Sequence, residues 1–164
     1  MCILETERLT LRQWKNTDFA QFAEYYADQN NAKYVGGQKS IDDAWRHFAL
    51  QIGHWHLQGF GYWALEEQST GNFVGCVGLW KSPGWPELEL GYWLLNAHQG
   101  KGYAREAALA SKEYALHVLK AASLVSYIDP NNTLSIKLAE SLDAKYEKTI
   151  ELLQHGPHCV YRHF

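Results

Sequence analysis

The hydrophobic positions change their period along the chain, and these changes divide it into predicted helices and strands. Residues 8–14 alternate leucine with polar residues, as a half-buried strand does. Two segments with apolar residues at helical spacing follow, residues 16–29 and residues 41–57, and Ser40 is a suitable N-cap for the second. The segment between them, residues 30–40, contains a pair of glycines and is predicted to be a loop.

The period then returns to that of strands before it becomes helical again. The pattern predicts strands at 61–67, 73–81 and 87–96, a helix at about 103–119, a strand at 123–128, a turn (DPNN), a helix at 133–142, and strands near 144–150 and 158–163. The order β-α-α-β-β-β-α-β-α-β-β predicts an α/β protein of the α+β kind, with helices packed on one mixed sheet. Neither a repeat nor a linker interrupts the pattern, so a single domain over residues 1–164 is expected.

Composition excludes several classes of function. The net charge of −3 does not favour a broad nucleic-acid-binding surface, so no direct nucleic-acid partner is expected. No apolar run approaches the roughly 20 residues that a membrane span needs, so no membrane partner is expected either. Charged residues occur before any apolar core at the start of the chain, which does not have the form of a signal peptide. A cytoplasmic location is therefore predicted.

The cysteines and histidines do not form a recognisable metal-binding or catalytic pattern. Cys2, Cys76 and Cys159 are widely spaced and include no CxxC pair, so free thiols in a reducing compartment are expected. The eight histidines are not framed by HExxH or by paired cysteines, and no metal is predicted.

Two glycines lie where the strand at 87–96 gives way to a helix, in the run NAHQGKGYAREAA. The first N–H groups of a helix lack internal partners and carry partial positive charge, which makes a helix start suitable for a phosphate or pyrophosphate. Gly100 and Gly102 remove side chains that would keep such an anion away, and Lys101 adds a positive charge. A helix that merely starts with glycines remains the alternative.

The glycine run does not match the two best-known nucleotide loops. It lacks the G-x-x-x-x-G-K-[ST] pattern of a Walker loop and the third glycine of a Rossmann fingerprint. It matches Q-x-x-G-x-G/A instead, with Gln99, Gly102 and Ala104, and so resembles the pyrophosphate loop of the GNAT superfamily of acetyl-CoA-dependent N-acetyltransferases.

Three longer segments resemble the RimJ/RimL-like branch of that superfamily, which acetylates the N-termini of ribosomal proteins. They are TERLTLRQW, LELGYWLLNAHQGKGYAREAA and DPNNTLSIKLAESLDAKYE. The chain departs from the branch at Asp143, where glycine is usual before the penultimate strand. Aspartate can adopt a left-handed conformation, so a turn is still expected there.

The resemblance implies a GNAT-like fold with a splayed pair of central strands, 87–96 and 123–128. The pantetheine arm of acetyl-CoA, the co-substrate, would lie in the gap like an extra strand. The residues expected to bind it are Leu94 and Leu95 through their backbone, Gln99, Gly100, Lys101, Gly102, Tyr103 and Ala104 in the loop, and Asn132.

Acetylation of an amine needs a group that removes a proton from the nucleophile. In the segment PELELGYW, Glu87 and Glu89 alternate with leucines and are expected to share one face of a strand. Glu89 lies closer to the expected acetyl group and is the candidate base. The alternative is an ordinary exposed glutamate on a strand.

The helix at 133–142 begins with a second pair of candidate residues. Asn132 lies three residues before Ser135 and is a plausible N-cap, which alone would explain its presence. The resemblance adds that Ser135 donates a hydrogen bond to the leaving sulfur.

The sequence therefore predicts an N-acetyltransferase that transfers an acetyl group from acetyl-CoA to a primary amine by direct attack in a ternary complex. The acceptor is expected to be a protein N-terminus or a small-molecule amine, and both a monomer and a homodimer remain open. A non-catalytic acyl-CoA-binding sensor or scaffold on the same fold is the main alternative. The failed Walker and Rossmann patterns disfavour a nucleotide-binding module.

Overall fold

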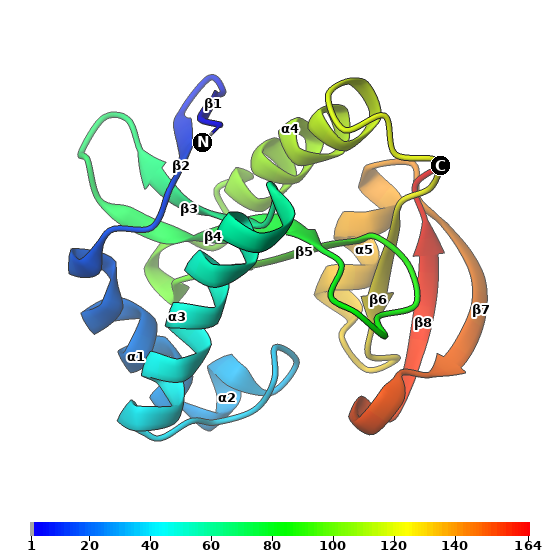
Figure 1. Cartoon of the computed structure of the whole chain (residues 1–164), viewed down its shortest axis with the longest axis horizontal. Coiled ribbons are helices and arrows are strands. Elements are labelled where there is room, and N and C mark those ends of the chain that lie inside the picture. The colour runs from blue at the N-terminus through cyan, green and yellow to red at the C-terminus, as the bar shows by residue number, and fades with distance from the viewer. Residues whose placement is uncertain (1) are drawn as a thin grey trace.

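The computed structural model describes residues 2–164, and these residues build one eight-stranded sheet in the order β1-β2-β3-β4-β5-β6-β8-β7 (Figure 1). Neighbouring strands run antiparallel except β5 and β6, which are parallel. The strands are β1 (Leu4–Glu5), β2 (Leu9–Arg12), β3 (Tyr62–Glu67), β4 (Phe73–Trp80), β5 (Glu89–Leu94), β6 (Val125–Ile128), β7 (Lys145–Glu151) and β8 (Pro157–Arg162).

Helices cover both faces of this sheet, with α1 and α3 on one face and α4 and α5 on the other (Figure 1). The helices are α1 (Phe19–Ala27), α2 (Gln29–Ala32), α3 (Ile41–Gln58), α4 (Tyr103–His117) and α5 (Thr133–Ser141), with 3-10 turns η1 (Asn16–Asp18), η2 (Asn96–His98) and η3 (Leu153–His155). The predicted mixed sheet and its packed helices are confirmed. No helix within residues 2–164 is long and apolar enough to span a membrane.

Two short elements were not expected from the hydrophobic pattern. The segment 30–40, predicted to be a loop, contains most of α2, because the Asp28 carboxylate accepts hydrogen bonds from the N–H groups of Asn30 and Asn31. The two-residue strand β1 pairs with the edge of β2 and is too short for any alternation to reveal it. The predicted N-cap of α3 is confirmed, since the Ser40 hydroxyl accepts from the Asp43 N–H at 3.2 Å.

Alternation along the strands separates two hydrophobic cores. On one face Leu9, Leu65 and Leu90 are fully or almost fully buried against small residues of α4, among them Ala107 and Ala108. The other face is aromatic, with Trp14 and Phe22 and other buried rings packed beneath α1 and α3. The alanines of α4 allow the helix to lie close to the sheet, which places its first turn beside the end of β5.

The parallel strands β5 and β6 pair only over a very short stretch and then separate. Within residues 2–164 the two strands share one paired position, Glu89 with Val125, where the Val125 N–H donates to the Leu88 carbonyl at 3.1 Å. The next contact comes from a side chain, since the Ser126 hydroxyl donates to the Leu90 carbonyl at 2.7 Å. Beyond this point the strands diverge, which confirms the predicted splayed pair and leaves the edge of β5 without a neighbouring strand.

Candidate active site

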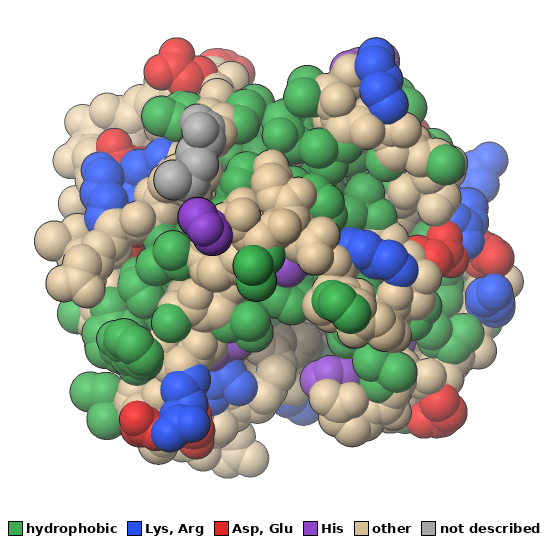
Figure 2. All heavy atoms as spheres, viewed as in Figure 1, with side chains coloured by type: hydrophobic (Ala, Val, Ile, Leu, Met, Phe, Trp, Pro, Cys, Tyr) green, Lys and Arg blue, Asp and Glu red, His purple; other side chains and the backbone are tan. Residues whose placement is uncertain are grey.

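A cavity of about 510 Å³ lies where β5 and β6 separate. Its lining comes from α1, α3, the strands β3 to β6 and the start of α5, and from the segments 34–39, 82–85 and 152–158. In Figure 2 the molecule is hollowed between the part that carries α1–α3 and the part that carries β7 and β8. The size of the cavity is typical of a site for a small molecule, about 300–1,000 Å³.

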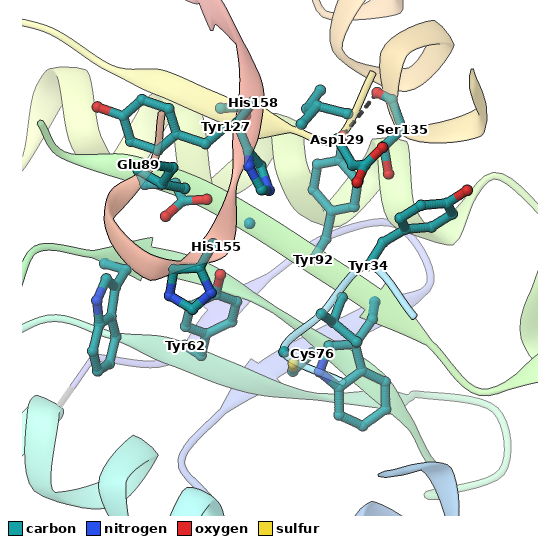
Figure 3. Close-up of a pocket in the computed structure, with 18 of the residues that line it drawn as sticks. Tyr34, Tyr62, Cys76, Glu89, Tyr92, Tyr127, Asp129, Ser135, His155 and His158 are labelled. Atoms are coloured by element: carbon teal, nitrogen blue, oxygen red, sulfur yellow. Dashed lines mark hydrogen bonds between the residues drawn. The ribbon is translucent and has the colours of Figure 1, made fainter. Parts of the chain in front are cut away.

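Glu89, the first residue of β5, places its carboxylate in this cavity (Figure 3). The Trp85 indole N–H donates to Glu89 Oε2 at 2.8 Å. Burial raises the pKa of Glu89 to about 7, although the hydrogen bond from Trp85 works in the opposite direction. A carboxyl group with such a pKa can both accept and release a proton near neutral pH.

Glu87, which the sequence placed on the same strand face as Glu89, lies outside the cavity lining. Its two carboxylate oxygens accept from the Arg162 guanidinium, both at 3.0 Å, and the Ser123 hydroxyl donates to it at 3.1 Å. Its hydrogen bonds from Arg162 hold the pKa of Glu87 below the ordinary value. Glu87 therefore joins the start of β5 to β8, and only Glu89 is available for chemistry in the cavity.

The glycine turn lies directly before α4, which begins at Tyr103, as the sequence predicted. Gly100 and Gly102 have φ angles of +74° and +81°, a region that residues with a side chain rarely adopt. Within residues 2–164, the N–H groups of residues 102–105 have no hydrogen-bond partner. The turn thus presents four consecutive donors at the start of a helix, an arrangement that suits a pyrophosphate.

Arg8 holds this turn from outside. Its guanidinium donates to the Lys101 carbonyl at 2.8 Å and forms an ion pair with Glu106, also at 2.8 Å. Tyr103 and Ala104 follow as the first two residues of α4, so the loop residues predicted from the sequence lie together. Because Arg8 lies against the loop, a Cβ atom on Gly102 would be 3.3 Å from Arg8 Nη2.

One predicted backbone contact needs correction. The Leu95 N–H donates to the Val74 carbonyl at 2.9 Å, and the Leu95 carbonyl accepts from the His98 N–H at 2.9 Å. Both groups of Leu95 therefore have partners in the protein. In an antiparallel pair, alternate residues direct their N–H and C=O groups away from the partner strand, so Leu94 and Tyr92 face the gap instead.

Gln99 closes the loop onto the strand through hydrogen bonds of its side chain and backbone. Its side-chain amide donates to the Leu94 carbonyl at 3.2 Å and to Asn96 Oδ1 at 3.3 Å. Its own N–H donates to the Asn96 carbonyl at 3.3 Å. Its place in the motif is explained by these bonds, which fix the path between β5 and the glycine turn.

The start of α5 forms the other wall of the gap. Asn132 caps the helix, with Oδ1 accepting from the Ser135 N–H at 3.3 Å, and both residues line the cavity. The Tyr92 hydroxyl donates to the Ser135 carbonyl at 3.0 Å, as Figure 3 shows. Farther along, Asp143 has a φ of +64°, so the expected left-handed turn is present without glycine.

Sequence reasoning missed three aromatic residues of this site. Trp85 lies in a turn-rich segment that shows no periodicity, and Tyr92 lies on the strand between the positions that were singled out. Tyr62 packs its ring against Gly91, since a Cβ atom on Gly91 would collide with the Tyr62 hydroxyl oxygen. Glycine inside a strand was the available signal, because it marks a close approach of another group.

Metal-ligating side chains are dispersed over the part of the chain that the structure describes. In residues 2–164 no three histidine, cysteine or acidic side chains converge in a way that could hold a metal ion. Cys76 is buried and Cys159 almost so, and both are free thiols.

Comparisons with known proteins give a consistent result. The family model described as an acetyltransferase (GNAT) domain matches residues 8–145. YkkB of Bacillus subtilis (strain 168) is 31% identical over 155 residues, which cover 90% of this chain and 87% of that protein. The crystal structure of an acetyltransferase from Agrobacterium tumefaciens str. C58 is 33% identical, with a TM-score of 0.92 over 100% of this chain and 95% of the other.

A more distant structure has the same fold. The ribosomal-protein-S5-alanine acetyltransferase from Vibrio fischeri is 18% identical and has a TM-score of 0.77, with 99% of this chain and 96% of the other covered.

Proposed function

The chain belongs to the GNAT acetyltransferase family, whose reaction transfers an acyl group from an acyl-CoA to an amine, and we propose that this protein transfers acetyl from acetyl-CoA to a primary amine by direct attack in a ternary complex. One observation carries the proposal: the cavity that contains a buried proton acceptor, Glu89, lies at the open edge of β5, and the glycine turn follows that edge.

The residues at this edge fit acetyl-CoA. The free N–H groups of residues 102–105 would bind the pyrophosphate, with Lys101 adding charge. The backbone of Tyr92 and the N–H of Leu94, which face the gap, would bind the pantetheine amides. Asn132 would contact the same arm from α5. Bound acetyl-CoA supplies the thioester whose carbonyl carbon the amine attacks.

Glu89 is the proposed general base. An amine nucleophile must lose a proton to become a neutral amide nitrogen, and a carboxylate within reach, directly or through one water, can accept it. The buried Glu89 carboxyl has a pKa of about 7, so it is a stronger base than an ordinary glutamate and is still half ionised at neutral pH. Trp85 holds the carboxylate in one orientation.

The Ser135 hydroxyl, at the start of α5, is the group proposed to assist the departing thiolate. The Ser135 side chain and the Tyr92 hydroxyl both line the cavity on that side. Burial raises the pKa of Tyr92 well above its usual value, so the phenol stays protonated and acts as a hydrogen-bond donor. Hydrogen bonding to the sulfur is therefore proposed for Ser135, with Tyr92 beside it.

The acceptor is proposed to be a protein N-terminus or a small-molecule amine. The likeness to a ribosomal-protein acetyltransferase supports the first class by analogy of fold. A small molecule is supported by the cavity, which is enclosed by aromatic rings on the α1 and α3 side.

Turnover on an amine panel tests the proposal. The protein is incubated with acetyl-CoA and small amines or N-terminal peptides, and free thiol and product mass are measured. We expect thiol release that depends on the amine. Thermal shifts are measured in parallel with acetyl-CoA, ATP and NAD, and only acetyl-CoA should stabilise the fold. Stabilisation by acetyl-CoA without transfer to any amine would favour the sensor alternative.

A further inference from the structure

The part of the cavity beneath α1 and α3 is built from flat rings. Trp93 is stacked on Tyr25 at 4.0 Å between centroids and 14° between planes, which holds its indole in place. Phe22, Tyr26 and Tyr62 line the same region. Rigid aromatic walls favour a flat apolar body, because they bury its surface at little cost in side-chain entropy.

Beneath α1 and α3 the described part of the cavity lining has no carboxylate besides Glu89 that could pair with a second ammonium. Glu89 and Asp129 are the carboxylates among the described lining residues. Asp129 lies beside Ser135 and Tyr92, at the side proposed for pantetheine (Figure 3), and it accepts from the Asn131 N–H at 2.8 Å in its own turn. Glu89 is required by the reacting amine. A polyamine would thus place its second charge without a partner.

The part of the cavity beneath α1 and α3, where the acceptor is proposed to bind, instead contains a positive charge and hydrogen-bond donors. Lys39 lines the cavity, with its ammonium over the Tyr26 ring at 5.5 Å from the centroid. Within residues 2–164 the one hydrogen-bond partner of this ammonium is the Gly36 carbonyl, at 3.2 Å. His47, which contacts the Tyr26 hydroxyl at 3.2 Å, and His155 also line the cavity. The ammonium of Lys39 therefore has donor capacity for an anionic group of the acceptor.

We infer that the acceptor is a small aromatic amine with one positive charge and a carboxylate, in which Glu89 receives the amine, the aromatic walls hold the ring and Lys39 pairs with the carboxylate. This inference rests on the proposed function and narrows its acceptor. In the reaction the ammonium first loses one proton to Glu89, and the neutral amine nitrogen then forms a bond to the acetyl carbon while the carbon–sulfur bond breaks. The nitrogen loses a second proton, the leaving thiolate gains one and departs as the thiol, and Glu89 returns its proton to solvent.

A matched pair of probe amines tests how much the carboxylate of the acceptor contributes. Phenethylamine and phenylalanine share a ring and an amine and differ in that one group, and spermidine represents a polyamine. For each, kcat/KM is measured from thiol release and product mass. We expect both aromatic amines to be acetylated more efficiently than spermidine. A preference for spermidine would overturn the inference.

Variants of Lys39 then test whether its ammonium pairs with the carboxylate of the acceptor. Lys39→Gln should lower the ratio of kcat/KM for phenylalanine to that for phenethylamine by about tenfold, as expected for loss of a charged hydrogen bond. Lys39→Arg should keep the ratio within about twofold, because it retains the charge. Lys33→Gln, an exposed lysine on the same segment outside the lining, is the control and should leave the ratio unchanged.

The outcomes separate this inference from the proposed function. An unchanged ratio in Lys39→Gln, or transfer only to peptide N-termini, would overturn the inference and leave the acetyltransferase proposal standing. Absence of transfer to every amine, while acetyl-CoA still stabilises the fold, would overturn the proposed function and the inference together.

Discussion

The pKa of the buried Glu89 side chain results from two opposing effects. Burial in the cavity raises its pKa to about 7, and the Trp85 N–H stabilises the ionised form. Because the folded pKa of this acid is above its unfolded value, ionising it costs stability as pH rises from about 4.5 to 7. Retention of a destabilising carboxylate in a cavity is expected where its chemistry is used.

Replacing Glu89 with glutamine should remove the proton acceptor and keep the volume of the side chain. We expect Glu89→Gln to lower both kcat and kcat/KM by about 100-fold, as is typical for loss of a general base. In the wild type, activity should fall as pH drops below about 7, where Glu89 becomes protonated. The variant should lack this acidic limb in a pH–rate profile. Glu113→Gln, at an exposed position on α4, is the control. If the acidic limb is unchanged in Glu89→Gln, another group is the base.

The indole of Trp85 gives a second test at the same carboxylate. Trp85→Phe keeps an aromatic ring and removes the N–H that stabilises ionised Glu89, so the pKa of Glu89 should rise further. The acidic limb should move to higher pH, and kcat/KM at pH 7 should fall by about fivefold. Trp80→Phe is the matched control, because Trp80 also lines the cavity but stacks on His54. If the acidic limb of the pH–rate profile stays at the same pH in Trp85→Phe, Trp85 does not stabilise ionised Glu89.

At the scale of elements, the junction between β5 and α4 depends on backbone that only glycine adopts readily. Gly102→Val would impose a branched side chain at a φ of +81°, against Arg8 and over the free N–H groups. We expect the stabilisation of the fold by acetyl-CoA to disappear in thermal melts.

Gly71→Ala separates backbone strain from ligand binding. Gly71 lies in the turn between β3 and β4 with a φ of +72°, and nothing would contact an added Cβ atom. The variant should be destabilised by about 1 kcal/mol and still respond to acetyl-CoA. An equal rise in melting temperature in the wild type and Gly102→Val would show that the turn does not bind the pyrophosphate.

The strands β3, β4 and β5 are coupled by one ring that lies across them. Tyr62 pairs with Gly78, which pairs with Gly91. Gly91 leaves room for the phenol ring, whereas an added Cβ atom on Gly78 would meet the backbone of Tyr62. Gly91→Ala should destabilise the fold by about 2 kcal/mol through overpacking. Adding Tyr62→Phe removes the closest atom, so the double variant should recover part of that loss in urea titrations. Strictly additive losses would contradict this packing.

At the scale of the whole molecule, buried histidines tie stability to pH. Burial lowers the pKa of His47 and of His163 to about 4, against 6.5 in the unfolded chain. The unfolded state therefore binds more protons than the folded state between these values, and stability is lost as pH falls from 6.5 towards 4. His163 contacts the Ser126 hydroxyl at 2.9 Å, so it lies directly behind the point where β5 and β6 separate.

Removing one of these histidines should flatten the acid dependence. From pH 7 to pH 5 we expect His163→Gln to lose about 2 kcal/mol less unfolding free energy than the wild type, measured by urea denaturation. His117→Gln changes an exposed histidine on α4 and should leave the slope as it is. The same slope in His163→Gln and the wild type would show that His163 titrates alike in both states.

Local patterns were sufficient to predict much of this protein. The alternation of residues 8–14 depends on which side of the strand faces the core, which is a property of the segment itself. The helix at 41–57 was also predicted, but Ile41, Trp45 and Ile52 of its apolar stripe are exposed, and Phe48 and Trp55 are the stripe residues that are buried. The glycine turn before the helix could also be predicted, because a tight turn into a helix limits the residues it accepts, and the structure adds that both glycines have positive φ angles. The family resemblance rested on the same short segments.

Only the tertiary structure decided which neighbouring groups reach the cavity. Glu87 and Glu89 are equivalent in the sequence, but Arg162 on β8 captures one of them and Trp85 holds the other inside the cavity. Leu95 lost its predicted role because Val74, on an adjacent strand, already accepts from its N–H. Which groups face the cavity depends on strand register and on contacts between residues far apart in the chain. A local pattern of side chains therefore cannot predict it.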